Sequence, residues 1–173
     1  AEQAGTLLHT SNWYRIENQE LLAERLCDVA NMDKVFFGNS GAEANEAAIK
    51  IARLHGKNKG VENPIILTAN QSFHGRTMAT LSATGNEKVQ AGFAPLVSEF
   101  IHVDFNDINA IKAFDGNSSV VAIMLEPIQG ESGVIIPDDD YLNNVQSICN
   151  NNNWLLILDE VQTGIGRTGK LFS

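Results

Sequence analysis

Two uninterrupted apolar runs constrain the fold of this chain more than any other feature. One covers residues 120–125 (VVAIML), and the other begins at Trp154 and continues through LLIL to Asp159. Such runs are typical of strands that are buried on both faces of a parallel sheet, because a strand with an exposed face alternates apolar and polar residues. Each run ends at an acid, Glu126 or Asp159. Since ligands of open α/β sheets bind at the carboxyl ends of strands, we expect a site there.

Strand and helix patterns alternate along the chain. The apolar periodicity predicts helices over residues 17–30, 43–55, 107–114 and 141–150, and strands over 64–69, 99–103, 120–125 and 154–161. The helix over 43–55 has the strongest pattern, and Gly56 is a plausible stop for it. This alternation predicts an α/β fold, with a mostly parallel sheet and flanking helices.

Composition excludes several classes of partner. A net charge of −9 over 173 residues argues against nucleic acid, because phosphate backbones attract a surplus of Lys and Arg. No apolar run approaches the roughly 20 residues that span a bilayer, so we expect no membrane partner. The first residues show no secretory signal, and the two cysteines, Cys27 and Cys149, fall in predicted helices, which suggests reduced thiols and a cytoplasmic protein. The scattered histidines form no metal motif.

A glycine-rich segment near the end of the chain imitates two nucleotide-binding motifs. Residues 164–169 spell G-x-G-x-x-G, but a dinucleotide fingerprint follows the first strand and opens a helix. With Lys170 the same residues approach a P-loop, except that Leu171 replaces the Ser or Thr that would hold Mg²⁺. We therefore interpret this segment as a turn.

Two other loops offer better binding groups. Ser40 and Glu43 form the S-x-x-E of a capping box at the start of the strongest helix, where free N–H groups and the positive helix end favour an anion. Ser40 could equally be a cap and nothing more. After the 64–69 strand, Phe73 could stack on a planar ring and Arg76 could clamp a carboxylate, whereas His74 is expected to be a structural hydrogen bonder.

These loops and the two strand ends are expected to converge. Together they offer an anion site, an aromatic plate, a cation for a carboxylate and a buried acid. A phosphorylated aromatic cation that carries a carboxylate-bearing substrate would need all four groups. Pyridoxal phosphate with an amino acid fits this description.

Four motifs together resemble one enzyme family. FFGNSGAEANEAAIKIAR, SFHGRTMATLSATG, EPIQGESGV and LDEVQTGIGRTG occur in the order in which they occur in the class III (subgroup II) aminotransferases, and the resemblance covers nearly the whole chain. It implies a fold-type-I transferase large domain and pyridoxal phosphate as cofactor. The chain would be only part of that domain, because the family's N-terminal segment, the rest of its large domain and its small C-terminal domain have no counterpart in residues 1–173.

The resemblance assigns cofactor contacts that agree with the residue chemistry. Gly41 and Ala42, with Ser40, would bind the phosphate through backbone and hydroxyl groups. Phe73 would stack on one face of the pyridine ring and Val161 would pack on the other.

The remaining roles that the resemblance implies concern the ring edge and the substrate. Asp159 would pair with the protonated ring nitrogen, and Gln162 would hydrogen-bond the ring hydroxyl oxygen. Arg76 would bind the substrate α-carboxylate, and Glu131 would pair with this arginine and moderate it between two substrates. Glu126 would support the site structurally.

The chain contains no residue that matches the family's catalytic lysine. The resemblance places the Schiff-base lysine about thirty residues beyond Asp159, past Ser173, so the chain alone is expected to be inactive. It also implies a homodimer with the active site at the interface.

The motifs are most similar to members that move an amino group between N-acetylornithine and 2-oxoglutarate in arginine biosynthesis. Members that act on ornithine, succinylornithine, 4-aminobutyrate or diaminopimelate-type substrates are alternatives within the family. A non-catalytic binding module built on the same fold is the alternative from a different class.

Overall fold

The structure is a computed structural model that describes residues 1–172 and contains two compact units, Ala1–Phe37 and Gly38–Ser173. The first unit holds helices α1 (Glu2–Thr6) and α2 (Glu17–Ala30), the second of which matches the prediction. Arg15 forms a two-pronged ion pair with Glu20 at the start of α2, with N–O distances of 2.6 and 2.8 Å. All residues that the sequence nominates for a site lie in the second unit.

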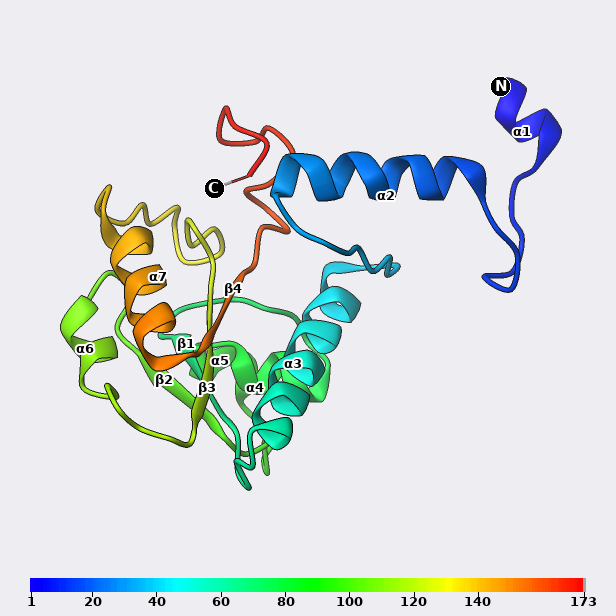
Figure 1. Cartoon of the computed structure of the whole chain (residues 1–173). Coiled ribbons are helices and arrows are strands. Elements are labelled where there is room, and N and C mark those ends of the chain that lie inside the picture. Colours follow the sequence, from blue (N-terminus) through cyan, green and yellow to red (C-terminus); the bar gives the residue numbers. More distant parts are fainter. Residues whose placement is uncertain (173) are drawn as a thin grey trace. The chain divides into compact units, whose positions relative to one another are not determined.

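A four-stranded parallel sheet forms the centre of the second unit (Figure 1). Its strands are β1 (Ile65–Ala69), β2 (Phe100–Val103), β3 (Val120–Leu125) and β4 (Leu155–Leu158). Their spatial order is β2-β1-β3-β4, and every neighbouring pair is parallel. The predicted α/β fold with a mostly parallel sheet is therefore confirmed.

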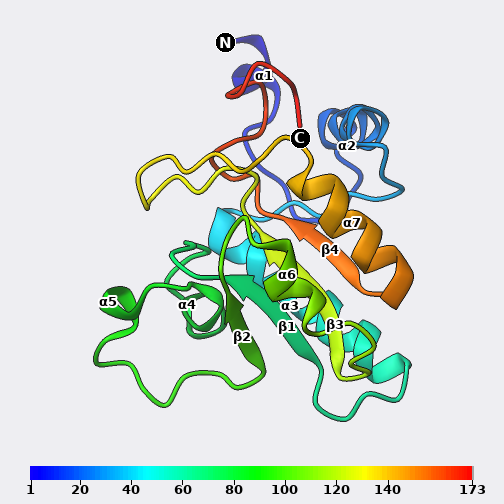
Figure 2. The ribbon, with the colours of Figure 1, turned by 90° about the vertical axis from the view of Figure 1, so that its left-hand side faces the viewer.

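Helices cover both faces of this sheet (Figures 1 and 2). The helices of this unit are α3 (Gly41–Asn58), α4 (Met78–Ala83), α5 (Glu87–Gln90), α6 (Ile108–Lys112) and α7 (Tyr141–Asn152). On one face, Ile49 and Ala52 of α3 pack against Ile66 and Met124 of the sheet. On the other face, side chains of α6 and α7 pack against the alternate residues of β1 and β3. The alternation of side chains along each strand thus produces two separate apolar cores.

The sequence prediction is right for β3 and wrong in part for β4. All six residues of β3 are buried, as expected for a central strand. The residues of β4 are only half-buried, and the strand ends at Leu158 instead of continuing to residue 161. Among the described residues β4 lies at the end of the strand order, so it has one neighbouring strand instead of two. An apolar run of this kind does not distinguish a central strand from an outer one.

The strand order also indicates at which end of the sheet a ligand would bind. The chain passes from β1 to β2 on one side and then returns to β3 on the other side of β1. Such a reversal of direction opens a crevice at the carboxyl ends of the two strands, which is where open α/β sheets bind ligands. The loops that follow β1 and β3 contain Phe73, His74 and Glu126.

Both cysteines lie in helices, Cys27 in α2 and Cys149 in α7, as the sequence predicts. Cys27 is half-buried and Cys149 is buried, and both are free thiols. Within residues 1–172, no helix is both long and apolar enough to cross a membrane.

Helix α3 does not stop at Gly56 but continues through it to Asn58, contrary to the prediction. The reason is close packing: a Cβ on Gly56 would lie 2.6 Å from Cγ1 of Val121 and 2.9 Å from Cβ of Pro64. Glycine at this position lets α3 approach β3, which outweighs its poor helix propensity.

We therefore expect Gly56→Ala to destabilise the protein, although alanine is the better helix former. Overpacking of this kind costs about 1–3 kcal/mol, which would lower the melting temperature measured by circular dichroism. Gly5→Ala is the matched control, because Gly5 is also helical and has no atom within 4 Å of the added Cβ. Equal melting temperatures for the two variants would contradict the packing argument.

Candidate functional site

A cavity of about 310 Å³ lies at the carboxyl ends of β1, β3 and β4 and at the amino end of α3. Its size is in the range of small-molecule sites. The residues that line it are Gly41, Ala42, Asn45, Phe73, His74, Gly75, Arg76, Glu126, Ile128, Asp159, Val161 and Gln162. The sequence nominates nine residues as cofactor or substrate contacts, and seven of them line this cavity: Gly41, Ala42, Phe73, Arg76, Asp159, Val161 and Gln162.

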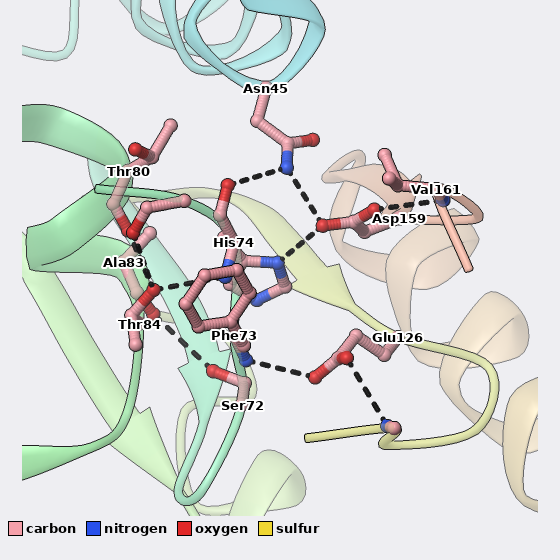
Figure 3. A network of polar contacts seen from close by, with 12 residues as sticks. Asn45, Ser72, Phe73, His74, Thr80, Ala83, Thr84, Glu126, Asp159 and Val161 are labelled. Carbon is pink, nitrogen blue, oxygen red and sulfur yellow. Dashed lines mark hydrogen bonds and ion pairs between the residues drawn. The ribbon is translucent and has the colours of Figure 1, made fainter. Parts of the chain in front are cut away.

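Asp159 is the centre of the polar network in this cavity (Figure 3). It follows β4 directly and is only 7% exposed. Its Oδ2 atom lies 2.7 Å from Nδ2 of Asn45 and 2.8 Å from Nδ1 of His74, and its Oδ1 atom accepts the N–H of Val161 at 3.1 Å. An ionised carboxylate has about four lone-pair sites, so three donors leave one site for a further donor.

His74 presents its ring to Asp159 and is itself fully buried. Because an ionised carboxylate can only accept, Nδ1 of His74 carries the hydrogen of this contact. Its Nε2 atom is buried and has no hydrogen-bond partner within the described residues. Within residues 1–172, His74 is the one basic side chain in contact with Asp159, and neither a lysine nor an arginine pairs with this carboxylate.

The loop that carries Phe73 and His74 is fastened to the end of α4. The N–H of His74 donates to Oγ1 of Thr84 at 2.9 Å, and Oγ of Ser72 accepts the N–H of Gly85 at 3.0 Å. The carbonyl of His74 accepts Nδ2 of Asn45 at 2.8 Å, so one amide group joins this loop to Asp159. These bonds fix the positions of the aromatic ring and the imidazole before any ligand binds.

Glu126 lies at the end of β3 and joins two of the loops. It is 5% exposed, and its Oε2 atom accepts the N–H of Phe73 at 3.0 Å (Figure 3). Its Oε1 atom accepts the N–H of Gly130 at 3.5 Å. Burial raises the pKa of the Glu126 carboxyl above its usual value, and these two N–H groups only partly oppose that shift.

The start of α3 has the geometry of an anion site. Oγ of Ser40 accepts the N–H of Glu43 at 3.2 Å, so the predicted N-cap is confirmed, but Ser40 itself is not among the cavity-lining residues. Gly41 and Ala42 line the cavity at the first turn, where backbone N–H groups have no partner within the helix. A Cβ on Gly41 would lie 2.7 Å from Cγ2 of Val161, so glycine is needed for this close approach.

Gln162 packs against the loop that follows β3. A Cβ on Gly130 would lie 2.3 Å from Oε1 of Gln162, so the amide occupies the space that a side chain at position 130 would take. Val161 precedes it and is 64% exposed. The structure therefore places both residues at the cavity, as the sequence predicts.

The two nominated substrate residues are placed differently. Arg76 lines the cavity, and its guanidinium carbon lies 6.0 Å from the centre of the Phe73 ring, within reach of a weak cation–π contact. Glu131 is exposed and does not line the cavity. Within residues 1–172 no ion pair joins Glu131 to Arg76.

Sequence reasoning missed Asn45 entirely, whereas its expectation that His74 is a structural hydrogen bonder is confirmed. Asn45 is the polar residue of an otherwise apolar helix face, five residues after the cap Ser40, and this interruption is the signal that could have nominated it. Its partner Asp159 lies 114 positions away in the chain, a separation that no local pattern bridges.

The glycine-rich segment 164–169 forms a turn and opens no helix, as predicted. The N–H groups of Ile165 and Gly166 donate to the carbonyls of Leu171 and Lys170 at 2.7 and 3.0 Å, which closes the turn on itself.

A larger hollow, of about 740 Å³, lies at the opposite end of the sheet. It is lined by surface loops around Lys59, Glu62 and Asn153, and Nζ of Lys59 already donates to the carbonyl of Asn153 at 2.6 Å. No buried ionisable side chain lines it. We therefore take the smaller cavity as the candidate site.

Comparisons with known proteins show the family of this chain. The family model described as aminotransferase class-III matches residues 1–173. The acetylornithine aminotransferase of Nitrosomonas europaea is 56% identical over 99% of this chain and 44% of its own length. The chain thus spans less than half the length of the curated relatives it matches.

Two solved structures show the same fold. The N-acetylornithine aminotransferase of Stenotrophomonas maltophilia superposes with a TM-score of 0.82 at 38% identity, over 99% of this chain and 42% of its own. The ornithine aminotransferase of Toxoplasma gondii superposes with a TM-score of 0.93 at 32% identity, over 99% and 41%. The latter structure is described as having partial occupancy of PLP at its active site.

The fold is that of the pyridoxal-phosphate-dependent aminotransferases. Within that fold, this chain belongs to the class III aminotransferases.

The network around Asp159 makes a testable prediction about stability. Asn45→Ala should lower the free energy of unfolding by about 1–3 kcal/mol, because it removes one of the three donors to Asp159 and the side-chain donor to the buried carbonyl of His74. Asn45→Asp should cost more, because it places a second carboxylate against the first.

Urea denaturation of the complete protein measures both effects. Asn58→Ala is the matched control, since Asn58 is an exposed residue at the end of the same helix, and it should change stability by less than about 0.5 kcal/mol. If Asn45→Ala and Asn58→Ala behaved alike, the network would not contribute to stability as argued.

Proposed function

We propose that the complete protein is a pyridoxal-phosphate-dependent aminotransferase. The observation that carries this proposal is Asp159, a buried carboxylate that has three hydrogen-bond donors, no lysine or arginine partner within residues 1–172 and one remaining acceptor site at the cavity. A protonated pyridine nitrogen would supply a fourth donor that carries a positive charge.

The residues present fit the rest of this cofactor. The unpartnered N–H groups at Gly41 and Ala42, with the positive end of α3, suit a phosphate, and Ser40 could add its hydroxyl. Phe73 and Val161 both line the cavity, one from the loop after β1 and one from the loop after β4, and they could contact the two faces of a planar ring. Gln162 would lie at the ring edge and hydrogen-bond its hydroxyl oxygen.

When bound, pyridoxal phosphate supplies an electron-withdrawing ring that accepts the electrons released when a substrate carbon loses its proton. Asp159 would hold the proton on the ring nitrogen, because a negative charge in a buried site favours the protonated form. Asn45 and His74 would hold Asp159 in place and prevent it from turning away. Phe73 and Val161 would orient the ring and exclude water from its faces.

Arg76 would bind the substrate carboxylate. It lines the cavity beside Phe73 and has no acidic partner within residues 1–172, so its guanidinium is available for a two-pronged contact with a carboxylate. We propose that Glu131 moderates Arg76 between the two substrates, although the two side chains are not paired in this structure.

A lysine is still required to hold the cofactor and to move the proton of the substrate. None of the seven lysines of this chain lines the cavity. We propose that residues 1–173 are part of the cofactor-binding large domain and that the lysine lies in the part of the protein that the relatives possess in addition. A cytoplasmic homodimer with the active site at its interface is part of the same proposal.

The proposed reaction transfers an amino group between N-acetylornithine and 2-oxoglutarate, a step of arginine biosynthesis. The 56% identity to a relative named acetylornithine aminotransferase supports this pair of substrates. Ornithine as donor is the second candidate, since the similar Toxoplasma gondii structure is an ornithine aminotransferase.

Two substitutions in the complete protein separate the proposed roles. Asp159→Ala should lower kcat by about 10³-fold or more, because the charge that stabilises the protonated ring acts in the transition state. Arg76→Ala should raise KM for the carboxylate substrates by about tenfold, with a smaller effect on kcat, because it removes ground-state binding.

Steady-state assays of glutamate formation from N-acetylornithine and from ornithine measure these effects. Lys112→Ala, an exposed cation on α6, is the control and should change neither constant. Equal and mild effects of the Asp159 and Arg76 variants would contradict the assignment of roles.

A further inference from the structure

Glu126 makes contacts that a residue of general structural support would not need. It is a buried acid at the wall of the cavity, and its two oxygens accept from two different loops. The loop after β1 carries Phe73, and Gly130 in the loop after β3 packs against Gln162, so each loop leads to one residue proposed to contact the cofactor. This carboxylate thus makes two hydrogen bonds, one to the backbone of Phe73 and one to the backbone of Gly130.

The first hydrogen bond of Glu126 holds the backbone of Phe73. Oε2 of Glu126 accepts the backbone N–H of Phe73, which lies 53 positions earlier in the chain, at 3.0 Å (Figure 3). The next peptide N–H, that of His74, is held separately by Thr84. The backbone on both sides of the Phe73 Cα is thus fixed by side-chain acceptors, and this sets where the ring can lie.

The second hydrogen bond of Glu126 holds Gly130, against which Gln162 packs. Oε1 of Glu126 accepts the N–H of Gly130 at 3.5 Å, a longer and weaker bond. Gly130 is in turn the backbone against which the Gln162 amide packs, at the place where a Cβ would lie 2.3 Å from Oε1 of that residue. A shift of Gly130 would therefore shift the surface on which Gln162 rests.

Building on the function proposed above, we infer that Glu126 is a positioning residue that sets the spacing of the cofactor slot between Phe73 and Gln162. It acts through Phe73 and Gly130 and needs no contact of its own with the cofactor. Both carboxylate oxygens must be acceptors for both loops to be held. A neutral group with one acceptor oxygen would hold only one of them.

Because Glu126 can gain a proton, the spacing between Phe73 and Gln162 should depend on pH. The other ionisable groups that line the cavity are His74, Asp159 and Arg76. Burial of Glu126 and the nearby charge of Asp159 raise the pKa of its carboxyl, whereas the N–H groups and His74 oppose the shift. On acidification Glu126 would gain a proton and lose one acceptor, and it would then resemble a glutamine at this position.

Induced circular dichroism of bound pyridoxal phosphate tests this inference in the complete protein. The cofactor is achiral, so its visible dichroism arises only from the way the protein fixes its ring. Glu126→Ala should reduce the amplitude per bound cofactor and weaken cofactor binding by about tenfold, because both loops are released. Glu126→Gln, which keeps one acceptor and the same shape, should lie between Glu126→Ala and the wild type.

Asp139→Asn is the matched control, because it removes one exposed carboxylate from the same connection between β3 and α7. It should leave both the amplitude and the affinity of the wild type. If Glu126→Ala does not fold, the isosteric Glu126→Gln tests the inference instead.

A pH titration of the dichroism gives a second, independent readout. The wild-type amplitude should fall towards the Glu126→Gln value on acidification, whereas the variant should lack this transition. Because His74, Asp159 and Arg76 are present in both proteins, their own titration is common to both curves, and the difference reports Glu126.

The outcomes separate the two proposals. If the wild type binds pyridoxal phosphate but both Glu126 variants match Asp139→Asn in affinity, amplitude and pH profile, the positioning role is overturned. If the wild type shows neither binding nor dichroism, the proposed function itself fails.

Discussion

The hydrogen bonds that hold Asp159 are the constraint on which the rest of the site depends. This carboxylate follows a strand of apolar residues and is almost fully buried, so it requires donors. Asn45 of α3 and His74 of the loop after β1 supply two of them, at 2.7 and 2.8 Å. Three segments that are far apart in the sequence are therefore held at one point, and the cavity forms around it.

The network is fully hydrogen-bonded in one respect and incomplete in another. Every oxygen of Asp159 has a donor, yet neither a lysine nor an arginine pairs with the carboxylate within the described residues. One acceptor site of this carboxylate therefore remains at the cavity for a further donor.

In our inference a second acid, Glu126, sets the shape of the same cavity but does not pair with the cofactor. Glu126 feels the charge of Asp159, but its hydrogen bonds hold the backbone of Phe73 and Gly130. Asp159 is suited to stabilise a positive charge in the cavity, whereas Glu126 is suited to set the distance between Phe73 and Gln162. The two acids follow neighbouring strands, β4 and β3, so the sheet itself fixes the separation between these functions.

The sequence by itself determined the α/β class, the central strand β3, the cap of α3 and seven of the residues that line the cavity. Strand burial, the helix cap and the chemistry of the loops are written in neighbouring residues. Ala42, Val161 and Gln162, in contrast, follow from the resemblance of the four motifs to an enzyme family. Only the tertiary structure decided that β4 is half-buried, that Gly56 is a packing contact, and that Asn45 and His74 hold Asp159. Those facts depend on strand order and on contacts across up to 114 positions, and no local periodicity encodes which distant side chain supplies a missing donor.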